Sequence, residues 1–352
     1  MTDPNTGLLA LALEAARRAG DFLRDGRPAD LAVAATKTSA IDVVTEMDIA
    51  SEKMITGFLA DRRPEDGFLG EEGASTEGTS GVRWIIDPLD GTVNYLYGRP
   101  AWAVSIAAER DGVTVVGVVH APMRGETCRA VLGGGAHLDD TPIQVNTAPS
   151  LDRALVGTGF GYLAGRKAHQ AAVAARIIPE VRDIRRGGSA AIDLCDVATG
   201  RLDAYYERGL NPWDYAAGEL IAREAGALTG GRPGAPASTE LTVAAPPGLF
   251  EPLQERLEGV RGLARRHPGL TPGTRPVFGP LSAEGPGPGR VRACGDGGAG
   301  GCGQAVEAVW TWTPCSAASR WRSSSSPCST SARNSSPVSW ARVRSDSVAS
   351  MR

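Results

Sequence analysis

The chain has 352 residues, with 37 lysines and arginines against 40 acidic residues, so its formal net charge at pH 7 is −3. This length allows one large domain or two smaller ones. A nearly neutral, slightly acidic balance argues against nucleic acid or an anionic membrane surface as the main partner. No basic stretch opens the sequence, and no apolar run approaches roughly 18 residues. We therefore expect neither a signal peptide nor a membrane span.

The composition changes near residue 262. Residues 263–352 contain 11 arginines, no lysine, four acidic residues and four of the six cysteines. This tail is rich in Pro, Gly, Ser and Arg and has no hydrophobic period, so we expect it to be disordered. It fits a natural extension or a shifted reading frame of a GC-rich gene, and we favour the shifted frame. The body, 1–262, keeps only Cys128 and Cys195, which is typical of a reduced, cytoplasmic protein.

The first part of the body predicts two helices followed by strands. Apolar residues recur every three or four positions from Leu8 to Leu23, which predicts a helix that ends near Gly26. Thr45 begins a second helix that runs to about residue 60, with an inward face that we expect to contain Ile49, Met54, Phe58 and Leu59. The composition of 67–81 is typical of turns. A strand is predicted at 84–87, ending at Pro88, and others at 102–108, 113–119 and 127–132.

The second part of the body continues the mixture of strands and helices. Strands are predicted at 154–157, 203–206 and 241–245, and helices at 167–178, 189–198, 214–225 and 249–259. Helices and strands that alternate throughout predict an α/β or layered α+β fold.

The strongest local motif is Asp87-Pro-Leu-Asp-Gly-Thr92, directly after an apolar strand. Pro88 has no N–H and ends strand pairing, so the chain turns while two carboxylates stay close together. Gly91 allows a close backbone approach, and Thr92 offers a hydroxyl and an amide. The motif therefore suits a hard cation with an anion beside it, although an ordinary Asp/Pro/Gly turn explains it equally well on its own.

Other acidic residues have structural explanations when each is taken alone. Asp214 can cap a helix, Asp48 matches a capping pattern with Thr45, and Glu71 and Glu72 resemble a solvated surface pair. All of them, however, lie beside turns and at the starts of helices or strands, where loops converge. Carboxylates gathered in a dry site must bind cations or take up protons.

These motifs together resemble the inositol monophosphatase family of magnesium-dependent, lithium-sensitive phosphatases, over about residues 8–260. The likeness rests on two signature segments, Trp84 to Tyr95 and Trp213 to Gly218, and on similar segments at 42–48, 70–72, 188–195 and 200–207. The resemblance implies a layered αβαβα sandwich of the inositol monophosphatase and fructose-1,6-bisphosphatase type. It also implies a homodimer. We divide the body into a metal-binding half, about 1–145, and a substrate-side half, about 146–262.

The resemblance further implies two to three Mg²⁺ ions in each site. Glu71, Asp87 and the carbonyl of Leu89 would hold the first ion. Asp87, Asp90 and Asp214 would hold the second, and Glu71 would help to bind a weaker third through water. A phosphate monoester is a dianion, and none of the implied site residues is a lysine or arginine, so cations would have to neutralise it.

Catalytic and substrate-binding roles follow from the same resemblance. Asp48 and Thr92 would orient and deprotonate the attacking water, because a threonine alone is too weak a base, and Glu71 would assist. The phosphate would rest on the metal ions and on the backbone amides of Gly91 and Thr92. The remaining substrate-binding residues implied are Gly188, Ser189, Ala190, Glu207 and Asp214.

The segments 90–98 and 207–214 most resemble the bacterial inositol-phosphatase branch of the family, and this resemblance favours inositol 1-phosphate among phosphate monoesters. Histidinol phosphate, fructose 1,6-bisphosphate and adenosine 3′,5′-bisphosphate would undergo the same chemistry on other alcohols. A binding role with the transcription machinery is an alternative from another class. The four histidines show no ligand spacing, so a zinc site is not expected, and neither a Gly-x-Ser-x-Gly elbow nor a Walker loop occurs.

Overall fold

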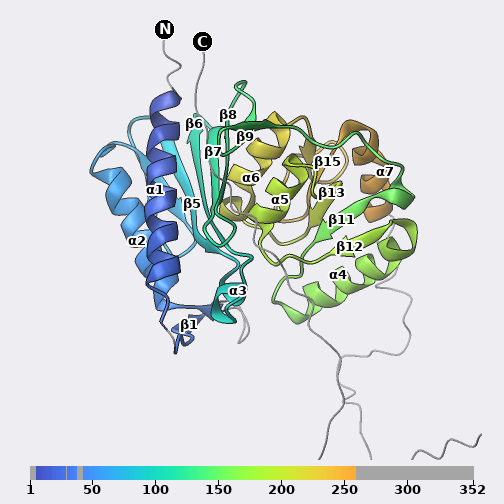
Figure 1. Ribbon diagram of the computed structural model, residues 1–352, viewed down its shortest axis with the longest axis horizontal. Helices are drawn as coiled ribbons and strands as arrows, with labels where there is room; N and C mark the ends of the chain where they lie inside the picture. The colour runs from blue at the N-terminus through green and yellow to red at the C-terminus, as the bar shows by residue number, and fades with distance from the viewer. Residues whose placement is uncertain (1–4, 29, 38–42, 259–352) are drawn as a thin grey trace, which may run out of the picture. The chain divides into compact units, whose positions relative to one another are not determined.

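A computed structural model describes residues 5–28, 30–37 and 43–258. The predicted tail, 263–352, lies outside the described residues. The larger of the two main sheets has eight strands in the order β10-β9-β8-β7-β6-β5-β3-β4 (Figure 1). Its neighbours are antiparallel except for β3 and β5, which are parallel. The bounds are β3 Gly67–Gly70, β4 Ser75–Thr76, β5 Val82–Asp90, β6 Ala103–Arg110, β7 Val113–Ala121, β8 Glu126–Val131, β9 Ala136–Leu138 and β10 Thr141–Ile143.

The smaller sheet has five strands in the order β12-β11-β13-β15-β14. Strand β11 is parallel to both of its neighbours, whereas β15 is antiparallel to both of its own. The bounds are β11 Leu155–Thr158, β12 Asp183–Arg185, β13 Ala204–Glu207, β14 Leu228–Gly230 and β15 Thr242–Ala245. A short antiparallel pair, β1 Ala35–Thr36 and β2 Val43–Val44, precedes both sheets.

The helices are α1 Thr6–Asp25, α2 Glu46–Ala60, α3 Thr92–Leu96, α4 Ala164–Ile177, α5 Ala190–Ala198, α6 Pro212–Glu224 and α7 Pro247–Glu258. Two single-turn 3-10 helices, Leu151–Arg153 and Ile178–Glu180, complete the described elements. Helix α1 presents a stripe of alanine and leucine to the larger sheet, and this small-residue face allows close packing. No described helix is both long and apolar enough to cross a membrane.

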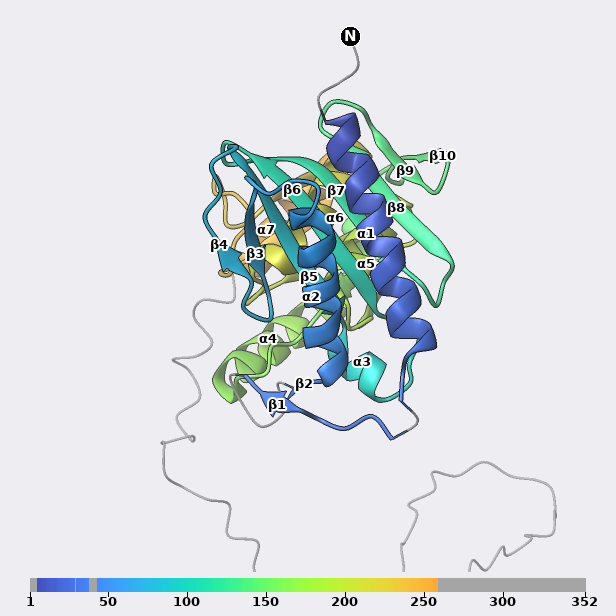
Figure 2. The same ribbon diagram turned by 90° about the vertical axis from the view of Figure 1, so that its left-hand side faces the viewer.

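Five layers result from this packing. Helices α1 and α2 lie side by side over one face of the larger sheet (Figure 2), and α5 and α6 lie between the two sheets (Figure 1). The other side of α5 and α6 packs on the smaller sheet, whose outer face is covered by α4 and α7. Four hydrophobic cores fill the spaces between layers, which confirms the predicted αβαβα sandwich.

Three sequence predictions of local structure are wrong in detail. Ile49 is 36% exposed, because the inward face of α2 is formed by Met47, Ile55, Phe58 and Leu59. Strand β5 does not end at Pro88 but continues to Asp90 through a bulge, where the register shifts and Pro88 needs no pairing N–H. Part of the turn-like segment 67–81 forms β3, which pairs with β5.

Candidate active site

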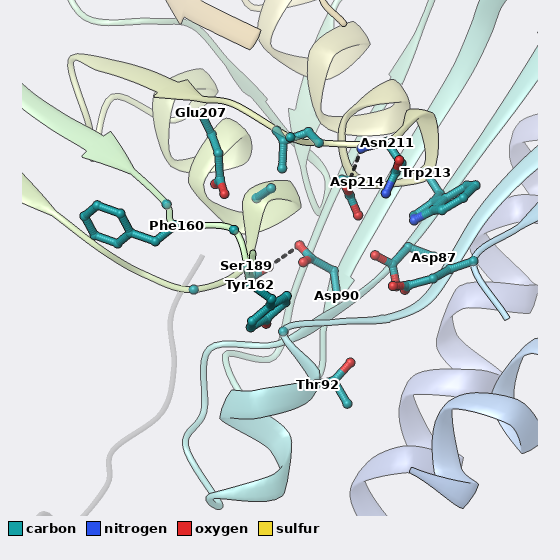
Figure 3. Close-up of a pocket in the computed structure, with 18 of the residues that line it drawn as sticks. Asp87, Asp90, Thr92, Phe160, Tyr162, Ser189, Glu207, Asn211, Trp213 and Asp214 are labelled. Carbon is teal, nitrogen blue, oxygen red and sulfur yellow. Dashed lines mark hydrogen bonds between the residues drawn. The ribbon is translucent and has the colours of Figure 1, made fainter. Parts of the chain in front are cut away.

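A pocket of about 390 Å³ is lined by the end of β5, the loop after β11, the end of β13 and the starts of α5 and α6. Its size suits a small phosphorylated alcohol. Every residue that the sequence suggested for the site lines this pocket, except Asp48, which lies behind Thr92. Figure 3 shows the carboxylates of Asp87, Asp90 and Asp214 directed into the same space from two segments, the end of β5 and the start of α6.

The bulged end of β5 supplies the first two carboxylates. Asp87 is only 1% exposed, and its Oδ1 accepts a hydrogen bond from the N–H of Leu89 at 3.0 Å. The hydroxyl of Ser51 on α2 donates to the Pro88 carbonyl at 3.1 Å and fixes this turn to the helix behind it. Burial, and after it the charges of Glu71, Asp90 and Asp214, raises the pKa of Asp87 well above its usual range.

Asp90 joins the larger sheet to the start of α5. Its Oδ2 accepts hydrogen bonds from the hydroxyl of Ser189 at 2.6 Å and from the N–H of Ala191 at 2.7 Å. The Ser189 side chain is also the N-cap of α5. Burial raises the pKa of Asp90 to about 6, although these two donors oppose the rise.

Asp214 stands in the first turn of α6. The N-cap of this helix is Asn211, and Asp214 is the third helical residue, whose Oδ2 accepts from the Asn211 N–H at 2.6 Å. The simpler explanation of Asp214 as an N-cap is therefore wrong by three positions, because Pro212 occupies the first helical position. Burial and the nearby charges of Glu71 and Asp90 raise the pKa of Asp214 well above its usual range.

Glu71 and Glu72 are not a solvated surface pair. Both are half-buried, and Lys37 donates to Glu71 Oε1 and to Glu72 Oε1 at 2.7 Å each. Burial raises the pKa of Glu72 to about 7, even though Lys37 opposes the rise. Basic residues do lie near the motifs: Arg83 and Arg208 adjoin them in the sequence, and Lys37 lines the pocket.

Asp48 and Thr92 form a hydrogen-bonded pair between α2 and α3. The Thr92 hydroxyl lies 2.8 Å from Asp48 Oδ1 and 3.2 Å from the Leu89 carbonyl. The other oxygen of Asp48 accepts from both the N–H and the hydroxyl of Thr45, so the predicted capping box is present. Asp48 is fully buried, and burial raises its pKa despite these donors. It thus serves the helix cap and the pocket at once.

Gly91 connects the acidic strand to α3 in a conformation that favours glycine. Its φ is +94°, and a Cβ here would lie 2.9 Å from the carbonyl of Ala101. Asn94, one helical turn on, donates to Ala101 O at 2.6 Å and to Gly187 O at 3.0 Å. This bracing holds the Gly91 and Thr92 amides close to the loop that contains Gly188, so the predicted phosphate and alcohol positions adjoin.

Glu207 ends β13 at the far side of the pocket. The Tyr205 hydroxyl donates to Glu207 Oε2 at 2.6 Å. Gly159 lies against the same carboxylate, because a Cβ there would overlap Oε2 at 1.9 Å. Burial raises the pKa of Glu207 to about 7, while Tyr205, Arg186 and Arg166 oppose the rise.

Metal ligation is tested by the donor chemistry of the site. The carboxylate oxygens of the pocket are the ligands that Mg²⁺ prefers, and their mutual repulsion is the kind that a cation relieves. Within residues 5–28, 30–37 and 43–258, no group of three or more His, Cys, Asp and Glu side chains is placed so that it could hold a metal ion, so the pocket carboxylates would have to move closer together to bind one. The donor set fits a divalent metal, and Glu71 would have to leave Lys37 to share one.

Sequence analysis missed four charged residues that the structure brings to the pocket: Lys37, Arg166, Arg186 and Asp193. Lys37 precedes its partner Glu71 by 34 residues and lies in a segment without periodicity. Arg166 stands near the start of α4, and Arg186 follows β12. Only Asp193 lies within a motif of the family resemblance, the segment 188–195, so the sequence contained a signal for this residue.

Comparison with known proteins agrees with this geometry. The profile of the family described as "Inositol monophosphatase family" matches residues 5–261. "Inositol-1-monophosphatase" of Mycobacterium leprae is 45% identical over 271 residues, 72% of this chain and 93% of that protein. "Nus factor SuhB" of Escherichia coli is 41% identical over 63% of this chain and 84% of that protein.

Solved structures of similar proteins have the same fold. The crystal structure of the extragenic suppressor protein suhB from Bartonella henselae superposes with a TM-score of 0.68 at 36% identity, covering 72% of this chain and 98% of that one. Enzymes of this family generally depend on a metal ion and act on small phosphorylated molecules. The chain belongs to the inositol monophosphatase family and is a phosphoric monoester hydrolase.

Proposed function

We propose that the protein is a Mg²⁺-dependent phosphatase that hydrolyses inositol 1-phosphate to myo-inositol and phosphate. One observation carries this proposal: Asp87, Asp90 and Asp214 converge on one pocket, and burial raises the pKa of each. Carboxylates gathered in this way, one buried and two half-buried, suit a site that binds divalent cations. The name of the M. leprae relative supports inositol 1-phosphate as the substrate.

Five residues would hold the metal. We assign Glu71, Asp87 and the Leu89 carbonyl to a first Mg²⁺ ion, and Asp87, Asp90 and Asp214 to a second. A weaker third ion would be held by Glu71 through water. When bound, Mg²⁺ would neutralise charge on the phosphate and lower the pKa of a water molecule.

The chain's own proton acceptor would be Asp48. Its Oδ1 lies 2.8 Å from the Thr92 hydroxyl, which faces the pocket, so Thr92 can pass a proton to Asp48 while it accepts one from water. The raised pKa of Asp48 suits a group that takes up a proton during the reaction. Thr45 would keep the carboxylate oriented throughout, because it binds the opposite oxygen.

Substrate would lie between the two sheets. The amides of Gly91 and Thr92 would bind the phosphate, and Asp214 would lie beside the ester. We place the alcohol against four residues of the substrate side: Gly188, Ser189, Ala190 and Glu207. The carboxylate of Glu207 would accept a hydrogen bond from an alcohol hydroxyl.

A phosphate-release assay tests this proposal. The full chain is assayed with inositol 1-phosphate, histidinol phosphate, fructose 1,6-bisphosphate and adenosine 3′,5′-bisphosphate, with Mg²⁺, without it, and with Mg²⁺ plus Li⁺. We expect the highest kcat/KM for inositol 1-phosphate, no turnover without Mg²⁺ and inhibition by Li⁺. Release that is independent of Mg²⁺, or a clear preference for another ester, would contradict the proposal. Asp183→Asn, which changes an exposed acid, is the matched control and should behave as the unmodified chain.

A second candidate function is association with the transcription machinery, since the E. coli relative is named as a Nus factor. The test is co-purification with RNA polymerase from the source organism, using the full chain and its Asp90→Asn variant. Association of both proteins would support a role that does not need turnover. Association of neither would remove this candidate.

We also infer that the catalytic part ends near residue 262 and divides near residue 145, and that it forms a homodimer. The family profile ends at residue 261, and the two main sheets comprise residues 67–143 and 155–245. A chain truncated after residue 262 should retain full specific activity and sediment as a dimer. Loss of activity on truncation would assign a function to 263–352.

A further inference from the structure

Asp193 is a buried carboxylate of the pocket that the proposed mechanism does not use. It lies on α5, is 4% exposed and lines the pocket. Among the residues that the structure describes, none donates a hydrogen bond to its side chain or forms an ion pair with it. An ionised carboxylate that is buried without a donor costs several kcal/mol, so a partner from outside the chain would stabilise it.

The helix directs Asp193 to the substrate side. Ser189, Ala190 and Asp193 are separated by three and four positions, so they share one face of α5, and all three line the pocket. On its other side the carboxylate lies against the backbone, because a Cβ at Gly187 would come within 2.3 Å of Asp193 Oδ1. The Gly187 carbonyl is itself held by Asn94. The carboxylate is therefore backed by a braced loop and borders the cavity.

Glu207 offers an instructive contrast at the same end of the pocket. Its carboxylate already has a donor, the Tyr205 hydroxyl, and two arginines nearby. Burial, and after it the negative charges of Asp196, Asp90 and Glu207, raises the pKa of Asp193 well above its usual range. The charge of Arg124 opposes this rise, but its guanidinium is bound to Asp196 at 2.7 and 3.2 Å. The carboxylate of Asp193 can therefore accept a hydrogen bond from a ligand.

We propose that Asp193 is a specificity-determining residue, which accepts a hydrogen bond from a hydroxyl of the substrate alcohol other than the one that Glu207 binds. The inference rests on the proposed phosphatase function and deepens it. It commits the enzyme to phosphate esters of polyols with at least two further hydroxyl groups in reach of α5 and β13. A substrate without hydroxyl groups would leave Asp193 unsatisfied, and the site would discriminate against it.

The experiment measures kcat and KM of the full chain and of Asp193→Asn with two substrates. Inositol 1-phosphate has hydroxyl groups, and p-nitrophenyl phosphate has none. We expect Asp193→Asn to lower kcat/KM for inositol 1-phosphate by about 10- to 100-fold, mostly through KM, and to change the value for p-nitrophenyl phosphate by less than about twofold. An equal loss with both substrates would overturn the proposal.

Monodeoxy analogues of inositol 1-phosphate locate the contact. With the unmodified full chain, removal of the hydroxyl that Asp193 binds should lower kcat/KM about as much as Asp193→Asn lowers it for inositol 1-phosphate. In Asp193→Asn the same removal should cost little, as a double-mutant cycle requires for a direct contact. Unchanged penalties for every analogue in Asp193→Asn would overturn the proposal.

Stability separates this role from a structural one. Asp193→Asn removes an acid that has no hydrogen-bond donor or ion-pair partner among the described residues. The melting temperature should therefore stay the same or rise, whereas replacing a structural carboxylate would lower it. The matched control is Asp196→Asn on the same helix, where the acid is bound to Arg124 and lies outside the pocket. It should melt earlier and keep its substrate preference. If the unmodified chain hydrolyses neither substrate, the proposed function itself is wrong. If it hydrolyses both and Asp193→Asn leaves its preference for inositol 1-phosphate unchanged, only the role of Asp193 is wrong.

Discussion

The two ends of strand β5 bury carboxylates in opposite ways. Near its start, Trp84 donates to Asp66, which is 3% exposed and also accepts from Arg63 and Ser80. Burial alone would raise the pKa of Asp66, but these donors lower it below its usual value. At the other end, burial and neighbouring acids raise the pKa of Asp87.

This contrast separates an acid that stabilises the fold from acids that await a ligand. Asp66 has every donor that it needs within the chain, so its ionised form contributes to stability. Asp87, Asp90 and Asp214 repel one another, and their ionised forms reduce stability until a cation binds. Burial alone therefore does not identify a functional acid, whereas burial without a compensating cation does.

The largest expected effect is the loss of activity when the aspartates of the pocket are replaced. Asp90→Asn or Asp214→Asn should reduce Mg²⁺-dependent kcat/KM at least about 1000-fold, because each removes a proposed ligand and the charge that binds the cation. The fold should survive, with an unchanged or higher melting temperature in the absence of metal. Near-normal rates in either variant would refute the assignment of these residues to metal binding.

The opposite end of β5 should show the reverse pattern. Asp66→Asn leaves Arg63 without its ion pair and weakens the bonds from Ser80 and Trp84. We expect the free energy of unfolding to fall by about 2–3 kcal/mol, while kcat/KM of the folded enzyme stays within about twofold. Urea unfolding measures the free energy of unfolding, with Asp61→Asn, which changes an exposed acid at the C-cap of α2, as the control. Stability equal to that of the unmodified chain would remove the contrast.

The pH dependence of stability should distinguish the two kinds of acid without mutation. Asp90 has a folded pKa of about 6, raised from 3.8, so between these values the folded state binds more protons than the unfolded state. Stability of the metal-free protein should therefore fall as the pH rises from about 4 to about 7, since Asp87 and Asp214 act in the same direction. Asp66 acts oppositely: its lowered pKa contributes stability that is lost on acidification below about pH 4.

Added Mg²⁺ should flatten the fall between about pH 4 and 7, because the cation favours the ionised carboxylates. Melting temperatures across this range, with and without Mg²⁺, measure the effect. A metal-free protein that gains stability steadily from pH 4 to pH 7 would contradict the origin that we give for the raised pKa values.

The smallest expected effect comes from a matched pair of serines. Ser80→Ala and Ser189→Ala each remove one hydroxyl donor, at 2.6 Å, to an aspartate: the buried Asp66 and the half-buried Asp90. Each should cost about 1 kcal/mol of stability. Only Ser189→Ala should also lower kcat/KM, by roughly tenfold, because it releases Asp90 and alters the start of α5. Equal activity in the two variants would show that Asp90 is positioned by other groups.

The sequence was most informative where acidic residues stand at the ends of regular elements. The apolar run before Asp87 predicts a strand, the Asp-Pro-Leu-Asp spacing predicts two neighbouring carboxylates, and the Thr45–Asp48 spacing predicts a helix cap. All three are present. These features depend on contacts within a few residues of chain, where spacing determines proximity.

Features that depend on distant partners escaped prediction. Lys37 meets Glu71 across 34 positions, and no periodicity marks such a contact. Strand β3 is rich in glycine and is stabilised by pairing with β5, so its local composition is misleading. Asp193 resembled any polar residue of an amphipathic helix, since only the surrounding fold shows that its face of α5 is enclosed.

A crystal structure of the full chain grown with Mn²⁺, which has an anomalous signal that Mg²⁺ lacks, would test the shared cation site most directly. We predict anomalous peaks between Asp87, Asp90 and Asp214, at about 2.0–2.3 Å from their oxygens, with Asp87 bridging two ions. A map without peaks in this pocket, at Mn²⁺ concentrations that support turnover, would contradict the assignment of the acidic end of β5 to metal binding.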